Sequence, residues 1–270
     1  MRRGTFLLMV APGAALLIFF FVIPLAAVSV DAFTGGGSAF ARVFRNELFW
    51  GGLRGTLTLA LTASVFSLLI GFAVALHLSR LREITRTILV FFIALPLTFS
   101  GLIVAYGFIL SYGRAGFVTQ ILAIAGIDPV TFSRLLFSPQ GLAFASSYYL
   151  IPRVVMLLLP VFVNFDTAQL DAAESLGATR GQTIRDIMIP QILPTAFTAF
   201  CLIAAVAIGA YGTALALVGT QVNILPLQLY SMISETGSDF PAAAALSLLL
   251  MAFCTCVIAV GEIVAARHEA

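Results

Sequence analysis

Long, uninterrupted runs of apolar residues limit what this chain can fold into. Six of them are long enough to cross a hydrocarbon core of about 30 Å, which takes roughly 20 helical residues. Inside lipid the backbone must satisfy its own hydrogen bonds, so only helices and closed β-barrels can span it. Barrel strands would alternate apolar and polar residues, whereas these runs are continuous. The sequence therefore predicts an all-α integral membrane protein.

The composition agrees with lipid as the main solvent. Of the 270 residues, 61% are hydrophobic and 10% are charged, whereas soluble domains carry about 25% charged residues. The net charge of +2 is too small to indicate nucleic acid as a partner. We expect a single membrane domain, 1–270, with spans near 6–30, 57–78, 88–110, 142–162, 196–218 and 242–266. The first run follows Arg2 and Arg3, but it is too long for a typical signal peptide.

The distribution of arginine predicts the orientation. All fourteen basic residues are Arg, because the chain contains no Lys. An even number of spans places both termini on the same side as the short Ser79–Thr87 loop, which holds Arg80, Arg82 and Arg86. Short loops rich in Arg remain in the cytoplasm, so we expect both termini there. On the opposite side, 121–127 and 131–137 are too short to span and are expected to form interfacial helices.

One substantial polar segment, Asp166–Pro194, separates the fourth and fifth spans on the arginine-rich side. Asp166 followed by Gln169 is a capping-box pattern, which predicts the start of a helix. Gly177 suits the left-handed position that ends a helix. The pattern is typical of two short helices joined by a sharp turn, because a second capping box follows.

The second helix of this segment is expected to begin at Thr179, with Gln182 completing its capping box. Pro190 is expected to end it, and Pro194 suits the first turn of the fifth span. Its apolar face, Ile184, Ile187 and Met188, has the spacing to meet the bundle, whereas the first helix offers a face of small residues around Ala172. A mere connector would not need two capped helices, so we interpret the segment as a docking site for a partner and not as an active site.

The segment resembles a known motif. Asp171-Ala172-Ala173, Gly177 and Ile187-Met-Ile-Pro190 match the spacing of the EAA motif of permease subunits in binding-protein-dependent ABC importers. That motif reads Glu-Ala-Ala, three residues, Gly, nine residues, Ile-x-Leu-Pro, so here Asp replaces Glu and Ile189 replaces Leu. The residues carried over as ATPase-coupling positions are Asp171, Ala172, Ala173, Glu174, Gly177, Ala178 and Pro190.

Weaker signals extend the resemblance over most of the chain. Pro12–Phe33, Tyr211–Gly219 and Leu225–Tyr230 look like the polyamine, ferric-iron, thiamine and phosphonate branch. The resemblance implies a type I importer permease of the inner membrane, in which a coupling helix sits in a cleft of a cytoplasmic ATPase dimer. It also implies an external solute-binding protein and a second, related permease subunit, with each permease forming half of the pathway for a small polar solute.

Nucleotide chemistry is not expected in this chain. A P-loop needs a Lys on the nucleotide phosphates, and this chain has none. We therefore expect no catalytic residue, metal site or cofactor here, with ATP and Mg²⁺ bound by the partner ATPase. That subunit would drive rigid-body alternation between inward-open and outward-open states.

Arg153 is the main candidate for contact with the solute. It lies near the middle of the fourth span, where a charge normally faces a cavity or a partner. We expect it to contact either an anionic solute group, or a backbone or hydroxyl group within the bundle or of the second permease. An unpaired Arg would suit phosphonate, phosphate-ester or carboxylate solutes better than polyamines, although a second permease could reverse that balance.

Three further residues are candidates for the solute pathway: Tyr149, Tyr211 and Thr213. The last two belong to Gly209-Ala-Tyr-Gly-Thr213, a helix-weakening cluster where an irregular turn could line the pathway. Close helix packing through small residues is the alternative for this cluster, and anchoring at the membrane interface is the alternative for the tyrosines.

Two other classes of protein remain as alternatives. A self-contained secondary transporter or channel would be expected to carry paired intramembrane acids or an internal repeat, and the sequence has neither. A membrane enzyme would need a nucleophile–base pair or a His/Asp/Glu cluster, yet histidine occurs only at His77 and His268.

Overall fold

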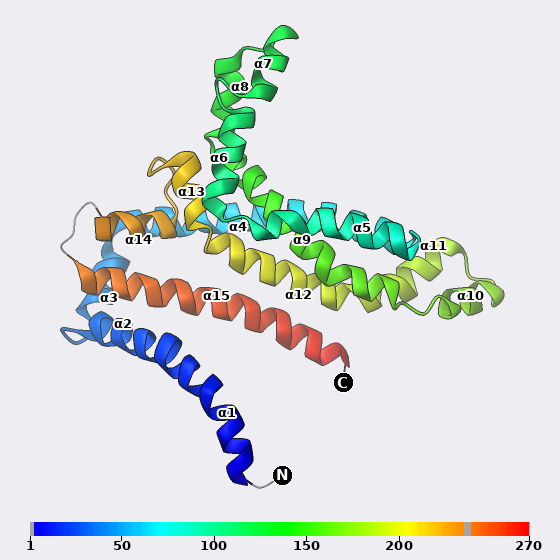
Figure 1. The fold of residues 1–270 in the computed structure, drawn as a ribbon, viewed down its shortest axis with the longest axis horizontal. Coiled ribbons are helices and arrows are strands. Elements are labelled where there is room, and N and C mark those ends of the chain that lie inside the picture. Colours follow the sequence, from blue (N-terminus) through cyan, green and yellow to red (C-terminus); the bar gives the residue numbers. More distant parts are fainter. Residues whose placement is uncertain (1–2, 235–238, 270) are drawn as a thin grey trace.

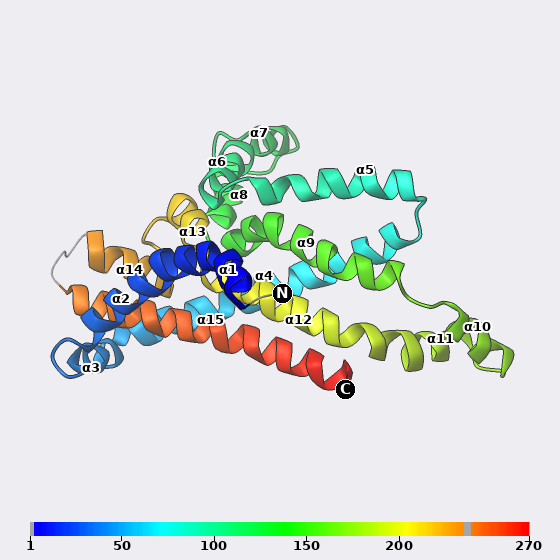
Figure 2. The same ribbon diagram turned by 60° about the horizontal axis from the view of Figure 1, so that its bottom comes forward.

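The computed structural model describes residues 3–234 and 239–269, and the side chains of 10–234 and 239–267. All regular structure within these ranges is helical. Arg2, which contributes to the predicted orientation, lies outside the described residues. Four long helices lie side by side along the long axis (Figure 1, Figure 2): α4 (Glu47–Ser79), α9 (Pro139–Val163), α12 (Ile189–Ile208) and α15 (Phe240–Glu269).

Six stretches of the described chain are long and apolar enough to cross a membrane: Val10–Phe33, Glu47–Ser79, Gly101–Ile124, Pro139–Val163, Arg180–Ile208 and Phe240–Arg267. The predicted all-α membrane protein with six spans is therefore confirmed. The bounds differ in places from the expected ones, and two of the differences concern helix breaks.

Small residues let the bundle helices pack closely. Ala63, Ser64 and Ser67 of α4 are fully buried. Gly71 of the same helix lies against α9, where an added Cβ would come within 2.6 Å of Val154. Within lipid the hydrophobic effect does not drive helices together. Close approach of the two backbones therefore stabilises the bundle through van der Waals contacts. The α4–α9 contact is therefore the rigid centre of the fold.

The two ends of the bundle differ. At one end, which we call the hairpin end, α10 (Ala168–Ser175) and α11 (Arg180–Thr183) project beyond the long helices (Figure 1). The turn from α4 into α5 (Glu83–Ala94) lies at this end too (Figure 2). At the opposite end lie α3 (Ser38–Arg45) and α14 (Leu225–Ser234).

A charged clamp ties α3 to α15 at the opposite end. Arg42 donates to both carboxylate oxygens of Asp239, from Nη2 at 2.8 Å and from Nε at 2.9 Å. Asp239 also accepts from the amide of Ala242 at 3.1 Å, so it caps the first turn of α15. The hydrogen bonds from Arg42 lower the pKa of the Asp239 carboxyl, and those to Asp239 raise the pKa of Arg42.

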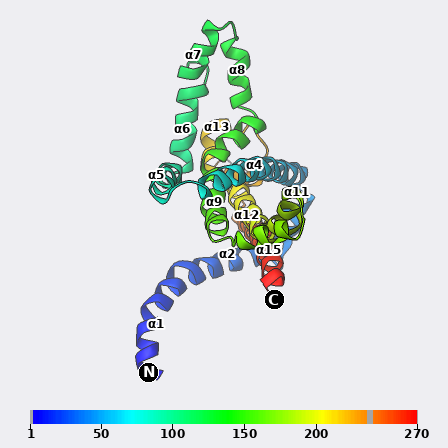
Figure 3. The same ribbon diagram turned by 90° about the vertical axis from the view of Figure 1, so that its right-hand side faces the viewer.

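Two segments leave the bundle on different sides. An arm of three helices projects away from it: α6 (Gly101–Tyr112), α7 (Phe117–Ile124) and α8 (Pro129–Leu136). Figure 3 shows this arm on one side of the bundle and α1 (Arg3–Leu17) descending on the other. A π-helical turn, Ile18–Val22, joins α1 to α2 (Ile23–Phe33), which packs on α15. Short helices do occur near the two predicted segments, 121–127 and 131–137, but α7 begins four residues earlier than expected and forms the end of the apolar stretch Gly101–Ile124.

The third expected span, 88–110, is not one helix. After α5 the chain forms a 3₁₀ turn, Leu95–Thr98, and α6 then starts in a new direction. Pro96 cannot continue the α-helical hydrogen bonding, and the side chain of Ser100 caps the new helix by accepting from the amide of Ile103 at 3.4 Å. The prediction of one span over 88–110 did not take this proline and this capping serine into account.

The fifth expected span, 196–218, is divided as well. Helix α12 ends at Ile208, and α13 (Tyr211–Val218) follows after Gly209 and Ala210. Ala210 has φ −73° and ψ 64°, which is not helical, and the amide of Tyr211 donates to the carbonyl of Gly209 at 2.7 Å. The predicted helix-weakening cluster at 209–213 is therefore an actual break.

Candidate functional site

The hairpin formed by α10 and α11 has the predicted helix–turn–helix form. Gly177 ends the first helix with φ +93°, in the left-handed region that favours glycine. The amide of Thr179 donates to Oε1 of Gln182 at 2.8 Å, which forms the predicted capping box of the second helix. These local signals fix the shape of the hairpin.

The start of α10 differs from the prediction. Asp166 does accept a hydrogen bond, from the amide of Ala168 at 3.0 Å, and the helix begins at that residue. Gln169 does not reach back to complete a capping box. Its Oε1 instead accepts from Nε2 of Gln191 at 2.8 Å, so it ties the hairpin to the start of α12. A tertiary contact has replaced the local one.

Pro190 does not end the second helix, so this expectation was wrong. The chain runs from α11 through a π-helical turn, Ile184–Met188, directly into α12. Pro190 directly follows this π-helical turn, where the regular α-helical hydrogen bonding is already interrupted. Pro194, expected in the first turn of the fifth span, lies inside α12. The hairpin is therefore joined to α12 through continuous helix, which transmits movement better than a loop.

The tip of the hairpin is free of contacts with the bundle. No residue of α10 is buried, and the small-residue face Asp171-Ala172 is exposed, with Ala173 half-buried. Glu174 is exposed and Ala178 is half-buried. Leu176 is 90% exposed, which is unusual for a leucine on the polar segment of a membrane protein. The EAA pattern does not include this position, so sequence reasoning missed it.

A cavity of about 210 Å³ lies where the two helix breaks meet. We call it the break cavity. All four predicted solute-contact residues line it: Tyr149, Arg153, Tyr211 and Thr213. The remaining lining comes mostly from the two breaks, namely from 96–101 and 209–212, with Val206. The structure thus brings together residues that are more than 60 positions apart in the sequence.

Close contact between two helix starts forms one wall of this cavity. A Cβ added to Gly101 would come within 2.5 Å of Oγ1 of Thr213 and within 3.2 Å of its amide nitrogen. Only glycine allows the first turn of α6 to lie this close to the first turn of α13. The 96–101 break was not predicted, although Pro96 followed by Ser100-Gly101 is a signal that could have revealed it.

The side chain of Arg153 contacts Tyr149, which lies one helical turn earlier on α9. Its Nη1 donates to the carbonyl of Tyr149 at 2.9 Å, and its Cζ lies 5.5 Å from the centre of the tyrosine ring. Among the described residues no acid pairs with it, because the two ion pairs found there involve other arginines. The guanidinium therefore has donors left over for a ligand.

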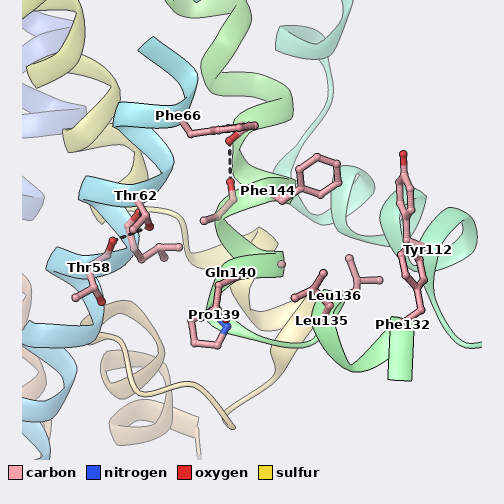
Figure 4. Close-up of a pocket in the computed structure, with 14 residues that line it drawn as sticks. Thr58, Thr62, Phe66, Tyr112, Phe132, Leu135, Leu136, Pro139, Gln140 and Phe144 are labelled. Carbon is pink, nitrogen blue, oxygen red and sulfur yellow. Dashed lines mark hydrogen bonds between the residues drawn. The ribbon is translucent and has the colours of Figure 1, made fainter. Parts of the chain in front are cut away.

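A larger cavity of about 690 Å³ lies between the arm and the bundle. Figure 4 shows it as an apolar groove between α4, α8 and α9, with Phe66, Phe144 and Leu135 among its walls. The hydroxyls of Thr58, Thr62 and Ser147 in its lining already donate to backbone carbonyls. The groove offers shape and apolar surface but no charge, so it is the weaker candidate for binding a polar solute.

A six-span helical bundle with a projecting EAA hairpin and an interior cavity at broken helices defines a permease subunit of an ABC importer. The chain belongs to the family described as "Binding-protein-dependent transport system inner membrane component", whose sequence pattern matches residues 65–269. It is therefore a multi-pass inner-membrane protein. Subunits of this family generally catalyse no reaction.

Curated relatives are identical to the chain at just over a quarter of the aligned positions. Sulfate permease 2, chloroplastic, of Chlamydomonas reinhardtii is 28% identical over 92% of this chain and 66% of its own length. The spermidine/putrescine permease PotB of Escherichia coli (strain K12) is 28% identical over 76% of this chain and 74% of its own. The putative ferric transport permease FbpB 1 of Haemophilus influenzae is 27% identical over 88% of this chain, but over only 38% of its own.

Solved structures agree on the fold. A chain of a bacterial alginate ABC transporter in complex with an alginate pentasaccharide-bound periplasmic protein superposes with a TM-score of 0.79. It is 19% identical, and the match covers 98% of this chain and 95% of that one. A second structure of a bacterial transporter that imports alginate gives a TM-score of 0.76 at 21% identity. The type I importer permease fold is therefore confirmed.

Proposed function

We propose that this subunit forms half of a translocation pathway that a partner ATPase drives through the α10–α11 hairpin. The single observation that carries the proposal is the hairpin itself: a fixed turn at Gly177, an exposed small-residue face and a leucine 90% exposed at the tip. An exposed apolar anchor on a rigid projection is typical of a protein contact. Asp171, Ala172 and Ala173 form the face that the ATPase grips, with Glu174, Gly177, Ala178 and Pro190 shaping it.

The proposal places the hairpin end in the cytoplasm. The arginine-rich turn between α4 and α5 lies at that end, and the excess of Arg in short cytoplasmic loops supports this orientation. Both chain termini then lie in the cytoplasm as well. ATP and Mg²⁺ belong to the partner, because this chain has no Lys to place on nucleotide phosphates.

Two further partners complete the transporter. An external binding protein delivers the solute at the opposite end, in keeping with the family description and with the periplasmic protein in the alginate transporter complex. A second, different permease subunit supplies the other half of the pathway. The support for it is that α1 and the arm leave the bundle, so their outer faces are not covered by the described part of this chain.

The solute pathway includes the break cavity, with Arg153, Tyr149, Tyr211 and Thr213 as its contacts. The expected solutes were small and polar, of the polyamine, thiamine, iron or phosphonate type. Relatives are named for sulfate, spermidine/putrescine and ferric transport, so they span both signs of charge and do not select one.

Purification of a tagged chain from its native membrane tests the driving mechanism. We expect it to co-purify with a P-loop ATPase and to transport solute only when that ATPase and ATP are present. Solute transport by the purified chain alone in liposomes would instead identify it as a self-contained secondary transporter or channel.

A further inference from the structure

The break cavity is lined by one full positive charge and by two helix starts. Among the described residues that line it, Arg153 is the only one with a charged side chain. The first turns of α6 and α13 also line it, and the first amides of any helix have no partner within that helix. Each helix start is equivalent to a partial charge of up to about +0.5, and the end of α12 and the 3₁₀ turn Leu95–Thr98, which also line the cavity, carry partial charges of the opposite sign. No carboxylate in the lining offsets the full charge of Arg153.

Thr213 adds a hydroxyl at the wall of the cavity. The residue is only 2% exposed, it lines the cavity, and its hydroxyl forms no hydrogen bond within the described chain. Its Oγ1 lies over the first turn of α6, close to where a Cβ of Gly101 would be. No side chain caps α13. At these two helix starts the amides of Ile103 and Tyr211 already have partners. The other first-turn amides and the Thr213 hydroxyl are the donors that a ligand in the cavity would meet.

We propose that the break cavity binds a small oxyanion, such as sulfate, a phosphonate or a carboxylate, as the solute or as its charged group. This inference rests on the proposed function, since it names the class of solute that the pathway accepts. The Arg153 guanidinium supplies the charge and a planar fork of donors. Thr213 and the amides of the two helix starts supply the remaining hydrogen bonds, as at other helix N-termini that hold anions.

The size of the cavity agrees with a small ligand. Drug-sized ligands occupy pockets of about 300–1,000 Å³, whereas this cavity measures about 210 Å³. At about 30 Å³ for each water in the liquid, it holds a small anion with part of its hydration. Cationic solutes such as polyamines would meet Arg153 with no carboxylate to offset it.

Ligand binding to the purified importer complex, without its binding protein, tests the inference. The probes are sulfate, methylphosphonate, acetate and putrescine, each titrated at constant ionic strength against chloride while the thermal unfolding midpoint is followed. We expect a saturable rise with at least one oxyanion and none with putrescine. Comparison of the three oxyanions shows whether the site prefers a sulfate, a phosphonate or a carboxylate group. A rise with putrescine alone, or with none of the four, would overturn the proposal.

Variants locate the binding. Arg153→Gln is expected to weaken oxyanion binding about tenfold or more, and Thr213→Val about threefold, because each removes hydrogen bonds to a charged group. Thr213→Ser keeps the hydroxyl and should bind like the wild type, which separates loss of a donor from misfolding. Arg134→Gln removes an equal charge from the arm and should leave oxyanion binding unchanged. Equal loss in all four variants would contradict a site at this cavity.

The same preparations distinguish this inference from the proposed function. Arg153→Gln should still co-purify with the ATPase, because the hairpin is untouched. If the wild-type complex contains an active ATPase but no oxyanion binds, the inference fails and the proposed function stands. If no ATPase co-purifies with the wild type, the proposed function fails first.

Discussion

The α10–α11 hairpin and the break cavity are both built where a helix stops at a glycine, yet they differ in what holds them. Gly177 turns with φ +93° and leaves the hairpin exposed, tied to the bundle by the Gln169–Gln191 hydrogen bond. Gly209 keeps an ordinary negative φ of −85°, and the cavity beside it is lined by residues of α9 and of the start of α6. The hairpin is shaped by local rules, and the cavity is shaped by tertiary contacts.

This difference teaches that one chain can separate two tasks. A projecting element with few contacts can be gripped and moved by a partner without disturbing the core. A site built on a close helix–helix contact can hold donors in fixed positions. Substitutions in one region should therefore leave the property of the other region intact, and each experiment below can break that separation or sharpen it.

The largest effect is expected from Gly101→Val, which attacks the cavity. The added Cβ would come within 2.5 Å of Oγ1 of Thr213, so the two helix starts must move apart. We expect solute transport to fall about tenfold or more while co-purification with the ATPase is retained. Gly107→Val on the same helix is the matched control, because nothing lies within 4 Å of its added Cβ. Equal losses in the two variants would mean that the contact at Gly101 does not matter.

Gly177→Ala attacks the hairpin. A side chain in the left-handed region costs about 1–2 kcal/mol, so the turn should form about fivefold less often or more. Transport and ATPase co-purification should fall together, whereas oxyanion binding to the cavity should stay unchanged. Gly181→Ala is the control, since that glycine has no positive φ and open space around it. A change in oxyanion binding by Gly177→Ala would break the separation of the two regions.

Gln191→Ala removes the tie between the hairpin and α12. A single exposed hydrogen bond contributes about 0.5–1.5 kcal/mol, so we expect ATP-driven transport to fall about two- to threefold. In a double-mutant cycle, adding Gln169→Ala should cause little further loss, because the 2.8 Å bond is already broken. Additive losses would show that the two glutamines act independently.

The smallest effect concerns the clamp at the opposite end, which belongs to neither region. Because Arg42 lowers the pKa of Asp239, the clamp contributes stability above the ordinary carboxyl pKa and loses it as pH falls through the lowered value. We expect Arg42→Gln to lower the unfolding midpoint by about 1–2 °C at neutral pH. The difference in unfolding midpoint between the wild type and Arg42→Gln should disappear below about pH 4. A difference that grows in acid would contradict the lowered pKa of Asp239.

The local parts of the structure could be predicted from sequence and the long-range parts could not. Apolar runs predicted six spans, and Thr179 with Gln182 predicted a capping box that is present, because these signals involve neighbours. Gln169 was expected to cap α10 but bonds Gln191, 22 residues later. No local pattern contains that contact.

The cavity shows the same limit. Arg153 could be singled out because a charge in a span is costly, and the break near Gly209 because glycine weakens helices. That Arg153, Tyr211 and Thr213 share one cavity depends on the bend after α5, which the predicted span 88–110 concealed. Pro190 was misread for a related reason, since a proline stops a helix only when the preceding turn cannot adjust.

Site-specific photo-crosslinking at Leu176 tests most directly whether the hairpin is the contact with the driving subunit. A crosslinking amino acid at this position is activated in membranes that hold the complete transporter, and its products are identified by mass spectrometry. Leu110, which is 74% exposed on the arm, carries the same probe as a control. We expect Leu176, and not Leu110, to crosslink to a P-loop ATPase subunit. Crosslinks from Leu176 only to lipid or to this chain itself would contradict the proposal that the hairpin contacts the ATPase.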